Sequence, residues 1–105
     1  MRRGTTPTIT ITVTGEDFSG ATMYVTLEQG DFEITKTGED VLVTPTQTGS
    51  TVAIFLSQEE TLMFVKGTAK IQIRWINSSG VAQASPIKNI EVNPILLEGV
   101  IEYGN

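Results

Sequence analysis

The segment TITITVT, residues Thr8–Thr14, alternates threonine with an aliphatic residue and indicates how this chain folds. Successive side chains of a β-strand point to opposite faces, so the alternation puts the isoleucines and the valine on one face and the threonines on the other. A strand of this kind packs one face on a hydrophobic core and leaves the other in water. The segment therefore predicts a half-buried β-sheet.

The same period of two returns along the rest of the chain, between short segments rich in glycine, asparagine and aspartate. It predicts strands at about 8–14, 21–29, 32–37, 40–45, 50–57, 68–77 and 80–92. The turns are short, so consecutive strands are expected to pair as antiparallel hairpins, one of them through Thr37–Asp40. The prediction is an all-β domain, an immunoglobulin-like antiparallel β-sandwich of about seven strands, with a small β-barrel as the alternative.

Two places interrupt the strand pattern. Ser57 and Glu60 have the spacing of a capping box, so one helical turn is expected there, carrying the chain from one sheet to the other. The pair Ser85-Pro86 interrupts the last predicted strand. Because proline donates no backbone hydrogen bond, an edge position or a β-bulge is expected at this pair.

The core can be predicted from the same alternation. Trp75 continues the set of Ile71 and Ile73, so its indole is expected to pack against the opposite sheet. A lone tryptophan on a binding surface is the alternative. Leu62 and Phe64, after the helical turn, are expected to close one end of the core.

Length and composition describe one small domain. A chain of 105 residues has room for one core but not for an additional catalytic lobe, so we predict a sandwich domain over 1–94 followed by a tail over 95–105. No apolar run is long enough for a membrane helix, and the basic start is not followed by the apolar region of a secretory signal, so neither membrane insertion nor signal-directed secretion is expected. The net charge of −5 disfavours binding to nucleic acid.

The residue types present restrict the chemistry. The chain has no histidine and no cysteine, which excludes imidazole and thiol catalysis, disulfides and cysteine zinc sites. The acidic pairs Glu16-Asp17, Glu39-Asp40 and Glu59-Glu60 fall in predicted turns and are interpreted as solubilising. No run has the spacing of a calcium loop, although two sandwich loops that share one ion remain an alternative. We therefore predict no enzyme, no catalytic residue, no cofactor and no metal site.

The two ends of the chain supply the candidate partner-binding residues. The tail is strongly apolar, and it either packs back onto its own domain or docks onto a neighbouring subunit. Arg2 and Arg3 form a small basic tip, either as part of that contact or as a solvated terminus. The candidate residues are Arg2, Arg3, Ile95, Leu96, Leu97, Val100, Ile101 and Tyr103.

Four parts of the sequence resemble a family of small proteins encoded by phages and prophages of Firmicutes. They are MRRGTTPT at Met1–Thr8, SQEETL at Ser57–Leu62 with Phe64, IQIRW at Ile71–Trp75, and EGVI at Glu98–Ile101. The similarity spans the whole chain. It implies a viral protein of the tail or baseplate, with a layout similar to the immunoglobulin-like N-terminal domains of some baseplate proteins. It implies no catalytic or ligand-binding residue.

The leading hypothesis is thus a non-enzymatic phage tail or baseplate protein. It would bind other phage structural proteins or a second copy of itself, in the virion or in the cytoplasm of the bacterial host. One alternative is a carbohydrate- or cell-surface-binding module, in which Trp75, Tyr24 or Tyr103 is exposed to stack on a sugar ring. Another is a regulatory or host-directed prophage protein that is absent from the particle. The fold does not separate these hypotheses, because β-sandwiches serve unrelated functions.

Overall fold

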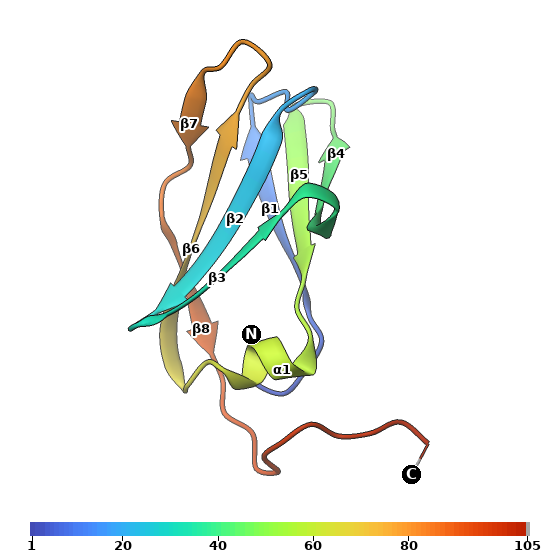
Figure 1. Ribbon diagram of the computed structural model, residues 1–105, viewed down its shortest axis with the longest axis vertical. Coiled ribbons are helices and arrows are strands. Elements are labelled where there is room, and N and C mark those ends of the chain that lie inside the picture. The colour runs from blue at the N-terminus through green and yellow to red at the C-terminus, as the bar shows by residue number, and fades with distance from the viewer. Residues whose placement is uncertain (105) are drawn as a thin grey trace.

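The computed structural model describes residues 1–104, which form two antiparallel β-sheets packed face to face (Figure 1). In the first sheet the strand order is β1 (Thr8–Thr14), β5 (Gly49–Phe55) and β4 (Val41–Pro45). In the second sheet it is β3 (Phe32–Thr37), β2 (Thr22–Gln29) and β6 (Gly67–Ile76), and both β7 (Ala82–Ala84) and β8 (Lys88–Val92) pair with the outer edge of β6. Over residues 1–104 the sheets do not close into a barrel, so the predicted β-sandwich is confirmed and the barrel alternative is wrong.

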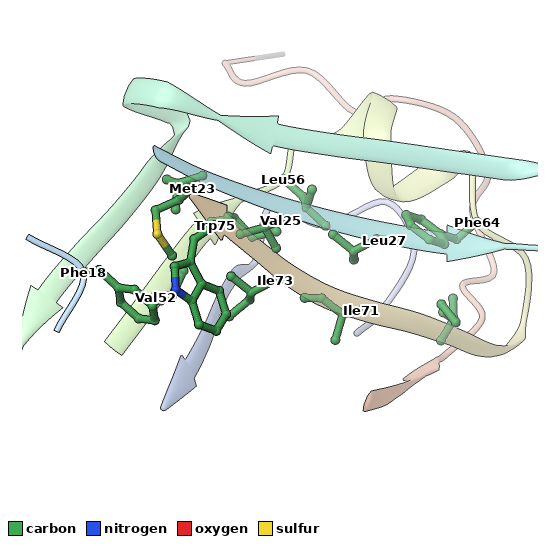
Figure 2. Close-up of a cluster of buried hydrophobic side chains, with 14 residues drawn as sticks. Phe18, Met23, Val25, Leu27, Val52, Leu56, Phe64, Ile71, Ile73 and Trp75 are labelled. Atoms are coloured by element: carbon green, nitrogen blue, oxygen red, sulfur yellow. The ribbon is translucent and has the colours of Figure 1, made fainter. Parts of the chain in front are cut away.

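The alternating apolar residues form the core between the sheets. β2, β5 and β6 each bury every second side chain, as their sequences predict. Trp75 is buried as predicted, and its ring and that of Phe18 meet in an edge-to-face arrangement with the ring centroids 5.0 Å apart (Figure 2). The indole Nε1 donates a hydrogen bond to the side-chain oxygen of Gln83, 3.1 Å away, which satisfies the one polar atom that this ring brings into the core.

The predicted hairpin at Thr37–Asp40 is wrong. Gly38–Asp40 form a short 3₁₀ turn, η1, which takes the chain from β3 in the second sheet to β4 in the first. Gly38 has φ of +62°, a conformation that glycine adopts without steric cost. The chain also changes sheets between β1 and β2 and between β5 and β6. If every connection were a hairpin, the strands would form a single sheet with its apolar face in water. Because the chain changes sheets at these three connections, two sheets form and each covers the apolar face of the other.

The predicted strand 80–92 is divided in two by a β-bulge. β6 pairs with β7 through Arg74 and Ala84, and with β8 through Ile71 and Lys88. Between these pairs, residues 72–73 of β6 face residues 85–87, so the outer strand has one residue more. The Ser85 hydroxyl accepts a hydrogen bond from the backbone of Ile73 at 3.0 Å. The interruption predicted at Ser85-Pro86 is therefore confirmed.

One end of the sandwich is closed by α1 (Gln58–Leu62) and the residues after it. Ser57 accepts a hydrogen bond from the Glu60 backbone at 3.2 Å and donates its own backbone N–H to the Glu60 carboxylate at 2.9 Å, so the predicted capping box is confirmed. Phe64 is fully buried and meets Phe32 edge to face, with ring centroids 4.9 Å apart. Leu62 is only half-buried, so Phe64 rather than Leu62 closes the core. Over residues 1–104 no helix is long and apolar enough to cross a membrane.

Candidate partner-binding site at the chain termini

The start of the chain and the residues from which the tail begins lie side by side at the end of the sandwich that α1 closes (Figure 1). Met1–Arg3 run parallel to the residues that follow β8, with a β-bridge between Arg2 and Asn93. The Asn93 backbone N–H donates to the carbonyl of Met1 at 2.7 Å, and the Arg3 N–H donates to the carbonyl of Asn93 at 3.1 Å. The start of the chain therefore fixes the point from which the tail leaves the domain.

Arg3 joins the body of the domain to the tail. Its guanidinium donates to the carbonyl oxygens of Leu62, the last residue of α1, and of Phe64. Nη1 donates to both carboxylate oxygens of Glu98 at 2.8 and 2.7 Å. Only 16% of the Arg3 side chain is exposed. The interpretation of Arg3 as a solvated terminus is therefore wrong. A guanidinium spreads five donors over three nitrogens in one plane and so reaches two carbonyls and a carboxylate at separate places, whereas a lysine offers three donors on a single nitrogen.

Arg2 has a different environment. Its side chain is exposed and donates one hydrogen bond, from Nη1 to the carbonyl oxygen of Pro94 at 2.7 Å. This contact leaves most of the guanidinium in water. Of the two predicted arginines, Arg2 is thus the one whose charge is presented at the surface.

The tail is extended and has no regular secondary structure over residues 95–104, and residue 105 of the predicted tail lies outside the described residues. Ile95 is half-buried, and its Cδ1 atom lies 2.8 Å from the position of a Cβ on Gly4, so any larger residue at Gly4 would displace Ile95. Every other predicted apolar residue of the tail is exposed; the exposed set is Leu96, Leu97, Val100, Ile101 and Tyr103. Of the apolar residues predicted in the tail, only the first, Ile95, is partly buried against the domain.

Polar contacts hold the tail in place. Besides the contact between Glu98 and Arg3, the Gln58 side chain forms two hydrogen bonds with the backbone of Ile101, accepting from its N–H at 2.9 Å and donating to its carbonyl at 3.0 Å. A side-chain amide that pairs with both backbone groups of one residue imitates the pairing of a β-strand. The Ile101 side chain takes no part in this contact. The backbone is fixed while the apolar side chains remain free to contact another molecule.

The sequence did not indicate Glu98 and Gln58 as anchors. Glu98 interrupts an apolar segment, which is a weak signal of a specific contact, and Gln58 resembles any polar residue in a first helical turn. Their role depends on pairing across 95 and 43 positions of the chain, which no local pattern reports.

One of the acidic pairs, Glu59-Glu60, contributes a contact between α1 and the second sheet. Glu60 forms an ion pair with Lys36 of β3, with 2.6 Å between Oε2 and Nζ. Partial burial raises the pKa of Glu60, but hydrogen bonds from Lys36 and Ser57 and the charge of Lys36 outweigh it, and the resulting pKa is below the usual range of a glutamate. The pair ties α1 to β3. Within residues 1–104 no three acidic side chains gather in a way that would hold a metal ion.

The aromatic residues proposed for sugar stacking differ in exposure. Trp75 is buried in the core, which removes it as a platform. Tyr24 is 41% exposed on β2, whereas Tyr103 is fully exposed in the tail.

No family model, curated protein or solved structure matches this chain.

Proposed function

We propose that this protein is a non-enzymatic structural or assembly component of a phage or prophage particle, of its tail or baseplate. It acts through contacts between its C-terminal tail and another protein of the particle. The resemblance of the four segments supports the phage origin. The main support for this contact is that the tail exposes several apolar side chains while Arg3 and Gln58 hold its backbone in place.

Two physical arguments support a docking role for the tail. Exposed apolar residues that gather in one short segment are uncommon on a monomer and are typical of interaction sites. In addition, a segment whose backbone is already fixed loses less conformational entropy on binding than a free one. The hydrogen bonds that hold Glu98 and Ile101 therefore favour a defined contact over unspecific adhesion.

The experiment is induction of the source prophage, purification of particles and detection of the protein in particles and cleared lysate. The wild type is compared with Leu96→Ser/Leu97→Ser, which removes two exposed apolar side chains of the tail. The matched control is Leu42→Ser/Val81→Ser, which removes two exposed apolar side chains from the sandwich.

The proposal expects wild type and control in the particles, and the tail variant in the lysate alone. Wild-type protein confined to the lysate would overturn the structural role and favour a host-directed one. Equal incorporation of all three proteins would show that the tail is not the docking surface.

A further inference from the structure

The outer edge of β1 carries backbone groups with no partner among residues 1–104. The backbone N–H of Leu56 donates to the carbonyl of Pro7, and that of Gly15 donates to the carbonyl of Thr48. These two bonds, just beyond the ends of β1, show which residues of β1 turn their backbone groups toward β5. In an antiparallel ladder these bonded positions recur at every second residue. The N–H and C=O groups of Thr8, Thr10, Thr12 and Thr14 therefore point away from β5, along the open edge of the sheet.

The other sheet edges carry features that oppose further pairing. β3 turns a charged side chain, Lys36, toward the inside of the sandwich. β4 ends at Pro45, β7 has 3 residues, and β8 follows a bulge and contains Lys88 and Glu91. Inward charges, prolines, bulges and short strands are the means by which natural proteins protect sheet edges. β1 has none of them over its 7 residues.

The apolar face of β1 is incompletely covered. Ile9, Ile11 and Val13 pack against the core but are only half-buried, whereas Val52 and Ile54 of the neighbouring β5 are almost fully buried. In the immunoglobulin strand order a further strand lies outside the one that corresponds to β1. No strand among residues 1–104 occupies that position, and the core is open along this side.

We propose that β1 pairs antiparallel with β1 of a second copy of this chain, about a twofold axis at Ile11. This register places Thr10 opposite Thr12 of the second copy and Thr8 opposite its Thr14. It pairs the open backbone groups of all four threonines, joins the two threonine faces and brings Ile9 next to Val13 of the second copy. The two three-stranded sheets become one continuous sheet, and the half-buried apolar residues of both edges are covered.

A second copy fits this edge better than another strand of the same molecule. The order TITITVT is chemically the same in both directions, so an antiparallel copy places like residues opposite each other. Because the chain carries a net charge of −5, self-association is opposed except along a surface without charges, and β1 is such a surface. The C-terminal tail is a poor match, because Gly99 and two glutamates interrupt its apolar residues.

The test introduces like charges at the paired positions and measures the dimer dissociation constant by analytical ultracentrifugation over a concentration series at low salt. Thr10→Lys/Thr12→Lys places the introduced lysines opposite each other across the axis, and Thr10→Glu/Thr12→Glu does the same with glutamates. Both threonine side chains are exposed, so neither variant introduces a charge into the core. Each variant alone is expected to dissociate at least about tenfold more readily than the wild type, and their mixture is expected to form a heterodimer.

Two controls separate this contact from others. Thr44→Lys/Thr46→Lys adds the same charge at the C-terminal end of β4 and is expected to dimerise as the wild type does. Leu96→Ser/Leu97→Ser removes tail side chains and is also expected to dimerise, so the result does not depend on the function proposed for the tail. A twofold edge contact is closed, so no mass above the dimer is expected.

A wild type that remains monomeric throughout the concentration series would overturn the proposal and leave the edge to a strand of another protein. Undiminished dimerisation of the lysine variant would overturn it as well, because the contact would then lie elsewhere. The emission of the buried Trp75 verifies that every variant is folded.

Discussion

β6 and the C-terminal tail are both rich in large apolar residues, yet one is buried and the other is exposed. β6 buries Ile71, Ile73 and Trp75 at every second position, and it is paired with strands on both sides. In the tail the apolar residues are consecutive, as at Leu96 and Leu97, and there is no strand pairing. Apolar content alone therefore does not predict burial in this chain. The period of the apolar residues and the pairing of the backbone determine it.

The largest loss of stability is expected in β6, where alternating apolar residues and strand pairing on both sides coincide. Ile73→Ala removes a fully buried side chain from the central region of β6. We expect a loss of about 2–5 kcal/mol in the free energy of unfolding, because the lost transfer energy adds to that of the cavity left behind. Urea denaturation followed by Trp75 fluorescence measures it. A loss below about 1 kcal/mol would mean that the core repacks around the missing atoms.

The next effect tests the junction between the two regions. Arg3→Ala leaves the carbonyls of Leu62 and Phe64 without their donor and releases Glu98. An expected loss of about 1–3 kcal/mol follows from leaving partly buried acceptors unsatisfied. Arg2→Ala is the matched control, because Arg2 is exposed and its loss should change stability by no more than about 0.5 kcal/mol. Similar losses for both variants in thermal unfolding would contradict the assignment of Arg3 as the link.

The contrast also explains which features could be predicted from sequence. β1, the capping box at Ser57 and the burial of Trp75 were predicted, because each depends on neighbours within a few residues. The crossing at Gly38 was not predicted, because a glycine turn looks alike whether the next strand stays in the sheet or leaves it. The choice depends on the covering of one sheet by the other, which is a property of the whole domain.

The candidate site was predicted only as a set of residues. Nothing local indicates that the start of the chain lies beside Asn93, since that bridge requires β8 to run back to the first residues. The role of Arg3 depends on the same long-range arrangement. The tail was correctly identified as apolar, but its lack of pairing and the anchors that hold it became visible only in the structure.

A smaller effect is expected from the ion pair that holds α1 to β3. Glu60→Gln keeps a side chain that can complete the capping box but removes the charge that faces Lys36. The pKa of Glu60 is lowered in the folded state, so its contribution is complete above the pKa of a glutamate in the unfolded chain and is lost as the pH falls through the lower, folded value. We expect the wild type to exceed the variant by up to about 1 kcal/mol at neutral pH.

This difference should disappear in acid, once the pH has fallen below the lowered pKa that Glu60 has in the folded state. Chemical denaturation at a series of pH values from neutral to strongly acidic measures it for both proteins. Glu59→Gln is the control, because it removes an exposed carboxylate of the same helix and leaves the ion pair between Glu60 and Lys36 in place. A gap between wild type and Glu60→Gln that persists unchanged into acid would exclude the charge as its cause.

The smallest change in stability is expected when an isoleucine of the tail, rather than of β6, is replaced by alanine. Ile101→Ala removes an isoleucine side chain that is 59% exposed, while the two hydrogen bonds to Gln58 use only the backbone and should persist. We expect the free energy of unfolding to change by no more than about 0.5 kcal/mol, against several for Ile73→Ala. Denaturation of both variants under one set of conditions measures the contrast directly. A cost for Ile101→Ala close to that for Ile73→Ala would mean that the tail is part of the folding core, and its apolar residues would then no longer be available as a docking surface.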